Sequence, residues 1–178
     1  MLMLLSLSRG IDRFTRFMGY HVRWLILAAV IVSAGNAIIR KVFDHSSNAW
    51  LELQWLLFGA VFMLAGAYTL QRNAHVRIDA LSNRFSKRTR DIIDLVCHLL
   101  MLAPFCLVLI WLSVPFFFNS FIENESSANA GGLAVWPAKL FILAGFSLLF
   151  LQMISETIKR AAILTGAMDE PTREGQHS

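Results

Sequence analysis

Residues 53–70, LQWLLFGAVFMLAGAYTL, are eighteen consecutive residues without a charged side chain. A helix spans the hydrocarbon core of a bilayer with about 20 predominantly apolar residues, within a range of about 17–25. This run therefore predicts a membrane-spanning helix at residues 53–71. A polar cluster, His75, Arg77 and Asp79, comes soon after it.

Three further runs nearly free of charge predict three more membrane helices. They are Trp24–Ile39, Leu95–Phe118 and Leu140–Ser155. The chain has 178 residues and is 56% hydrophobic, above the roughly 45–50% of soluble domains. One such run would fit a buried core helix, but four in a chain this short leave almost no polar surface to cover them. The sequence predicts an all-α membrane protein whose transmembrane domain, 24–160, holds helices at about 24–40, 53–71, 94–118 and 138–156.

The two ends of the chain are more polar than this domain. In residues 1–23, Ile11, Phe14, Phe17 and Met18 alternate with basic residues, a pattern typical of an amphipathic helix lying on the membrane surface. The order of apolar and basic residues is the reverse of that in a secretory signal peptide, so we expect the first hydrophobic segment to remain as an uncleaved anchor. Residues 161–178 are expected to form a disordered polar tail.

The distribution of Lys and Arg predicts the orientation. Bases gather in the N-terminal segment, in the connection 71–94 and after the fourth helix, whereas the loop before Lys139 carries Glu123 and Glu125. Cytoplasmic loops are enriched in Lys and Arg. We therefore expect both termini and the 71–94 segment in the cytoplasm, and residues 41–52 and 119–139 outside. Arg40 and Lys41 are the exceptions.

Small residues suggest how the helices pack. Gly59 and Gly66, and Ala60 and Ala67, are each seven residues apart, which predicts a small-residue stripe that allows close helix approach. Asn36 is interpreted as a hydrogen-bonding group toward a neighbouring helix rather than an ion ligand. Pro104 and Pro115 each remove a backbone donor and permit a kink in the third helix.

Charged groups at mid-membrane depth, which usually mark ion pathways, are not apparent. Asp94, His98 and Glu156 lie near the predicted cytoplasmic ends of helices, and Glu156 is interpreted as a surface partner of Lys159 and Arg160. The sequence also offers no internal repeat. We therefore do not expect a complete secondary transporter.

Enzyme chemistry finds no support in the sequence either. Cys97 and Cys106 lie on one apolar helix without metal-binding spacing, and no nucleophile–base pair or phosphate-binding loop is visible. We expect no catalytic residue, no cofactor and no metal in this chain. The net charge of +4 is explained by membrane orientation and does not call for nucleic acid. His98 alone lies inside a helix, so a haem-linked membrane anchor is a weaker alternative.

Two segments resemble a known family. The segment NAIIRKVFDHSSNAWLELQWLLFGAVFMLAGAYTLQRNAHVRIDAL, residues 36–81, and the motif WPAK, residues 136–139, are similar to the small, DctQ-like membrane subunit of tripartite ATP-independent periplasmic (TRAP) transporters. The resemblance covers about residues 12–160. The subunit-interface or structural residues that we single out on these segments are Arg40, Trp50, Glu52, Gly59, Gly66, His75, Arg77, Asp79, Trp136, Pro137 and Lys139.

The resemblance implies a function through partners. In that family a periplasmic binding protein delivers an organic acid, and a large membrane subunit carries it inward with sodium. The small four-helix subunit braces the large one. We therefore expect a stable complex with the large subunit, a transient contact with the binding protein, sodium in the large partner and a place in the bacterial inner membrane. The alternative is an anchor or assembly subunit of a haem- or quinone-linked respiratory enzyme.

Individual roles are assigned as hypotheses. Arg40 and Glu52 lie at the outer ends of consecutive helices and are predicted to form an ion pair. Gly131 and Gly132 are expected to be a flexible point of the outer loop. A metal site or proton relay at His75–Asp79 lacks further ligands or membrane depth, so this segment is predicted to be a cytoplasmic docking element for the large subunit.

Overall fold

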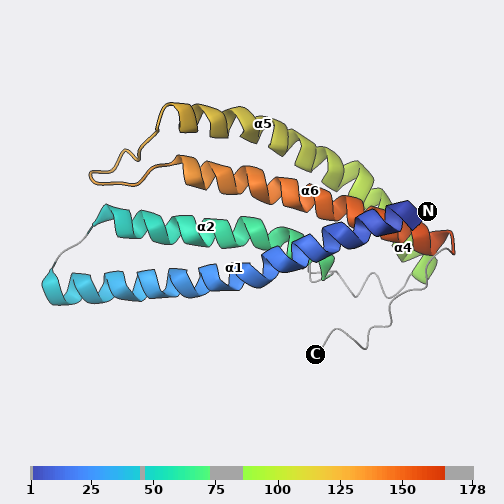
Figure 1. Ribbon diagram of the computed structural model, residues 1–178, viewed down its shortest axis with the longest axis horizontal. Helices are drawn as coiled ribbons and strands as arrows, with labels where there is room; N and C mark the ends of the chain where they lie inside the picture. The colour runs from blue at the N-terminus through green and yellow to red at the C-terminus, as the bar shows by residue number, and fades with distance from the viewer. Residues whose placement is uncertain (1, 45–46, 73–85, 167–178) are drawn as a thin grey trace.

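The computed structural model describes residues 2–44, 47–72 and 86–166, and over these residues it is a bundle of long helices (Figure 1). No strand occurs in these ranges beyond an isolated bridge between Ser126 and Ala134. Four helical stretches are long and apolar enough to cross a membrane, which confirms the predicted fold class. The elements are α1 (Leu2–Phe43), α2 (Asn48–Gln71), α4 (Lys87–Cys97), the π-helical turn η1 (His98–Leu102), α5 (Ala103–Ile122) and α6 (Trp136–Leu164).

The bundle has two ends that bring together different segments of the chain. At the loop end, on the left of Figure 1, α1 and α5 finish and α2 and α6 begin. At the terminal end, on the right, α1 begins and α6 finishes, and α4 lies beside α6, whereas α2 finishes short of this end. The first half of α1 crosses α6 obliquely at the terminal end (Figure 1).

The helix α1 is one continuous element of 42 residues. At 1.5 Å per residue it is about 63 Å long, twice the roughly 30 Å thickness of the hydrocarbon core. The predicted surface segment 1–23 and the predicted span 24–40 are therefore joined without a break. Its buried positions recur every seven residues: Ser8, Thr15, Val22, Ala29 and Asn36.

The other helices repeat this interval. Ala60 and Ala67 are buried in α2, and Cys106, Ser113 and Ser120 are buried in α5. A seven-residue repeat of inward-facing positions is the pattern of helices packed at a shallow left-handed angle. Small side chains at these positions let membrane helices approach closely. The helices of this chain thus meet along seams of mostly small residues.

The stripe predicted in α2 is confirmed for its alanines and differs for its glycines. A Cβ atom at Gly59 or Gly66 would have no heavy atom within 4 Å, so neither glycine forms a close contact with another helix. The close approach uses Gly145 of α6 instead, where a Cβ would lie 2.8 Å from the Met63 carbonyl oxygen. On the other side of α2, Gly19 packs against the Tyr68 ring in the same manner.

The third span contains a widened turn. The Ala103 N–H donates to the His98 carbonyl, five residues earlier. Pro104 comes next in the chain, and a proline lacks the donor that an ordinary helical turn would use. The π-helical turn therefore accommodates the proline, while Pro115 lies inside α5.

Candidate functional site

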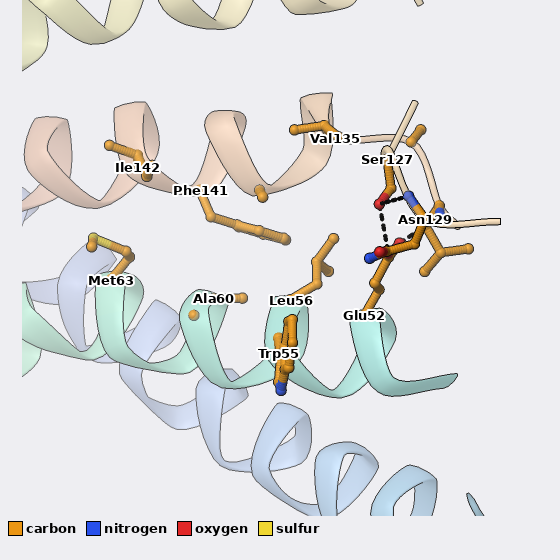
Figure 2. Close-up of a pocket in the computed structure, with 14 residues that line it drawn as sticks. Glu52, Trp55, Leu56, Ala60, Met63, Ser127, Asn129, Val135, Phe141 and Ile142 are labelled. Carbon is orange, nitrogen blue, oxygen red and sulfur yellow. Dashed lines mark hydrogen bonds between the residues drawn. The ribbon is translucent and has the colours of Figure 1, made fainter. Parts of the chain in front are cut away.

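The loop end is organised around the carboxylate of Glu52, near the start of α2. Its Oε1 accepts hydrogen bonds from the Ser127 hydroxyl at 2.5 Å and from the Asn129 amide at 2.8 Å. Its Oε2 accepts from the Leu133 backbone N–H at 2.7 Å. Figure 2 shows Ser127 and Asn129 reaching this carboxylate from the loop. We call this arrangement the loop-end clasp.

The predicted ion pair between Arg40 and Glu52 is wrong for the described residues. Arg40 lies exposed in the last turn of α1, and both oxygens of Glu52 receive donors from the loop before α6. The physical reason is proximity, because this loop folds back onto α2 and brings three neutral donors to the carboxylate.

The two loop glycines have specific structural roles. Gly131 has a φ of +70°, a left-handed conformation that favours glycine. At Gly132 a Cβ atom would lie 2.9 Å from each Glu52 oxygen. The Ser127 N–H donates to the Leu133 carbonyl at 2.9 Å across the turn. The expected flexible point is therefore a fixed turn closed around Glu52.

The WPAK motif connects the same loop to the adjacent helices. The Trp136 ring meets Phe121 edge-on, with centroids 5.4 Å apart, and Pro137 lies in the first turn of α6, where its missing N–H has no helical partner to lose. Lys139 forms an ion pair with Glu125, and its ammonium lies 4.1 Å from the centroid of the Phe116 ring. The hydrogen bond from Lys139 holds the pKa of Glu125 below its usual value.

A groove of about 440 Å³ runs beside the clasp between α2 and α6. Its walls are mainly apolar, and Glu52, Ser127 and Asn129 form its polar end (Figure 2). Gly59 lines the groove on the α2 side. The apolar lining includes Trp55, Leu56, Ala60, Met63, Phe141 and Ile142.

The terminal end holds a second polar arrangement, which we call the terminal cluster: Ser8 and Asp12 of α1 with Gln152, Ser155, Glu156 and Lys159 of α6. The Asp12 carboxylate accepts from the Gln152 amide at 2.9 Å, the Ser155 hydroxyl at 2.7 Å and the Lys159 ammonium at 3.1 Å. Ser8 and Ser155 share a hydrogen bond of 2.8 Å.

The predicted pairing of Glu156 with Lys159 is confirmed, at 2.5 Å, but the predicted surface position is wrong. Glu156 is 5% exposed, and its carboxylate also accepts from the Gln152 amide at 3.0 Å. Lys159 therefore stands between two carboxylates, one from α1 and one from α6. Burial of Glu156 results from the crossing of α1 over this end of α6.

Further contacts attach α2 and α4 to this end. The Gln71 amide, at the end of α2, donates to the Asp12 backbone carbonyl at 2.8 Å. Arg160 of α6 pairs with Asp91 of α4 at 2.5 Å and reaches Asp94 at 3.5 Å. Arg160 thus joins α4 to α6 instead of supporting Glu156.

The remaining predicted residues have different outcomes. His75, Arg77 and Asp79 lie outside the described residues, so the docking element there stays a prediction. Trp50 is exposed in the first turn of α2. Over the part of the chain that the structure describes, no group of three or more His, Cys, Asp or Glu side chains is arranged to hold a metal ion.

Sequence reasoning missed the terminal cluster, although two signals pointed to it. Asp12 is the only acidic residue before Asp44. Gln152, Ser155, Glu156 and Lys159 succeed one another at helical spacings that place them on one face of α6. An isolated acid in a basic segment and a polar face at the end of an apolar run are each expected to need a partner.

One comparison with known proteins gives a match. A family model described as tripartite ATP-independent periplasmic transporters, DctQ component, matches residues 29–162. The match begins within α1 and ends near the end of α6. No curated protein and no solved structure shows significant similarity to the chain.

Proposed function

Because the chain belongs to the DctQ component family of tripartite ATP-independent periplasmic transporters, we propose that it braces the large membrane subunit during sodium-coupled uptake of an organic acid. Membership makes the chain a small, multi-pass membrane subunit of such a transporter. In this proposal the large subunit binds the sodium and carries the substrate, and a periplasmic binding protein delivers that substrate.

The observation that supports a bracing role is the use of the acidic side chains. Asp12, Glu52, Asp91, Glu125 and Glu156 each bond to another part of the same chain. A substrate or ion path would instead need polar groups directed at a route through the bundle. The sides of α1 and α5 expose large apolar residues, which suits contact with lipid and with another helix bundle.

The proposed assembly is tested by co-expression with the large subunit and the binding protein. We expect the affinity-tagged chain to co-purify with the large subunit, and cells lacking this chain to lose sodium-dependent uptake of the organic acid. Full uptake by the large subunit and binding protein alone would contradict the proposal, as would uptake unchanged when sodium is replaced by potassium.

The same proposal places the terminal end in the cytoplasm and the loop end in the periplasm of the inner membrane. It is supported by the excess of Lys and Arg in the segments of the terminal end, because cytoplasmic segments are enriched in these residues. Ala128 and Thr165 are exposed at opposite ends, so each can be replaced by cysteine in a chain without Cys97 and Cys106. A membrane-impermeant maleimide should label only Ala128→Cys in intact spheroplasts, and labelling of Thr165→Cys alone would reverse the orientation.

A further inference from the structure

A basic stripe runs along one face of the first half of α1. Arg9, Arg13, Arg16 and Arg23 are exposed, and with Tyr20 they are separated by four, three, four and three residues, a spacing that keeps them on one side of a helix. Within the described ranges, the ion pairs involve Lys139, Lys159 and Arg160 and none of these four arginines. The stripe therefore presents positive charge without an acidic partner in this part of the chain.

Contacts with the neighbouring helices establish the depth of Arg23. Val22 packs in one core with Leu64 of α2 and Leu148 of α6. The charge-free run of α2 continues six residues beyond Leu64, to Leu70, and that of α6 continues seven residues beyond Leu148, to Ser155. At 1.5 Å per residue, Val22 therefore lies about 10 Å deeper in the membrane than the ends of these two charge-free runs.

A tilt of the helices in the membrane does not account for this depth of Val22. The charge-free runs of α1, α2 and α6 contain sixteen, eighteen and sixteen residues, which corresponds to about 24–27 Å. They are already shorter than the roughly 30 Å hydrocarbon core, and a strong tilt would demand longer runs. The backbone of Arg23 therefore lies at hydrocarbon depth, although its side chain is on the surface of the bundle.

The side chain of Arg23 turns toward the terminal end. Its guanidinium carbon lies 3.3 Å from the centroid of the Tyr20 ring, one helical turn closer to that end, and 5.9 Å from that of Trp24. Long basic side chains in membranes extend in this way toward the headgroups. The next base of the stripe in that direction is Arg16.

We propose that Arg23 and Arg16 bind the phosphate of an anionic phospholipid whose headgroup is drawn inward along α1. The charge complementarity is clear, since the stripe holds four cations and anionic lipids attract basic segments at the membrane surface. Lipid fits better than an acidic helix of the large subunit, because the stripe leads continuously from Arg23 toward the terminal end. Between Arg23 and Arg40, the exposed residues of α1 are apolar, including Trp24, Leu27 and Ile31.

The test uses the full-length chain extracted from vesicles of equimolar phosphatidylglycerol and phosphatidylcholine, with retained lipid counted by native mass spectrometry. We expect the wild type to retain phosphatidylglycerol in preference to phosphatidylcholine. Arg23→Gln should lower this retention several-fold, and Arg23→Lys should lower it less. Arg40→Gln changes an exposed arginine at the other end of the same helix and should leave retention unchanged, and circular dichroism checks that each variant is folded.

Two results would overturn the proposal. The first is that Arg23→Gln retains as much phosphatidylglycerol as the wild type does, or that the wild type retains phosphatidylglycerol and phosphatidylcholine equally. The second is loss of the large subunit from Arg23→Gln while the isolated variant still binds phosphatidylglycerol, which would assign Arg23 to an acidic group of that subunit.

Discussion

The two ends of the bundle each surround one carboxylate with three hydrogen-bond donors, but the donors differ in charge. In the terminal cluster, Asp12 shares Lys159 with a second carboxylate, Glu156, which is almost completely buried. In the loop-end clasp, Glu52 receives only neutral donors, all from one loop. The first arrangement joins two helices far apart in sequence, whereas the second fixes a loop onto a helix.

We expect the terminal cluster to contribute to the stability of the whole bundle, and the loop-end clasp to hold only the loop. In the terminal cluster two carboxylates share one cation in a partly buried site, so removal of Lys159 leaves both negative charges without compensation. A carboxylate that accepts bonds from a loop can lose a donor while the helices stay packed. We therefore expect damage to the terminal cluster to unfold the protein more readily, and damage to the clasp to release the loop.

The largest effect is expected for Lys159→Met, which leaves Asp12 and Glu156 facing each other without their shared cation. Removing one partner from a fully buried ion pair typically costs about 3–5 kcal/mol. The Lys159 and Asp12 side chains are 22% and 19% exposed, so we expect a loss at or below the lower end of that range. Thermal unfolding in detergent, monitored by circular dichroism, should show a clearly lower midpoint. Lys41→Met, at an exposed base of α1, is the control. Equal unfolding midpoints for Lys159→Met and Lys41→Met would show that the terminal cluster does not stabilise the bundle in this way.

A smaller effect is expected for Gln152→Leu. Its amide donates to both Asp12 and Glu156, and leaving bonded charged groups without a donor costs about 1–3 kcal/mol. Chemical denaturation in mixed micelles would measure the change. Gln54→Leu replaces a half-buried glutamine of α2 and controls for the gain in apolar character. If Gln152→Leu is as stable against the denaturant as Gln54→Leu, Gln152 does not stabilise the two carboxylates as proposed.

At the loop end, Glu52→Gln should act locally. A glutamine offers one acceptor oxygen where the carboxylate offers two. Its NH2 group, a donor, replaces either the oxygen that accepts from Ser127 and Asn129 or the oxygen that accepts from Leu133. We expect faster hydrogen exchange at the Ser127 and Leu133 amides, with a smaller shift of the unfolding midpoint than for Lys159→Met. Glu123→Gln, an exposed acid of the same loop, should leave exchange unchanged. Unchanged exchange in both variants would show that the clasp does not hold the loop.

The sequence was sufficient to predict the helices because each apolar run has a length that the bilayer dictates. It also identified the alanines of α2 as packing residues, since a spacing of seven keeps them on one seam. The sequence singles out the WPAK motif as structural. Trp136 contacts Phe121, Lys139 pairs with Glu125, and Pro137 lies in the first turn of α6.

The polar partners were beyond sequence reasoning for a physical reason. Asp12 and Lys159 are separated by 147 residues, and their meeting depends on how far α1 extends past the end of α2. The Arg40–Glu52 prediction relied on nearness along the chain and on opposite charge. The carboxylate instead bonds to the loop donors, because the turn at Gly132 brings the loop backbone against it.

The smallest change in the unfolding midpoint is expected when the ion pair of Glu125 with Lys139 at the loop end is removed. The hydrogen bond from Lys139 lowers the pKa of Glu125 below its ordinary value of 4.5. A lowered carboxyl pKa adds stability that is fully present above the ordinary value and is lost as pH falls through the lowered one. The unfolding midpoints of the wild type and Glu125→Gln should therefore differ by a constant amount at neutral pH and converge at acidic pH. Glu125 is 41% exposed, so salt should also reduce the difference. A difference that grows on acidification would show that Glu125 does not stabilise the fold through its charge, and the contrast with the terminal cluster would need another cause.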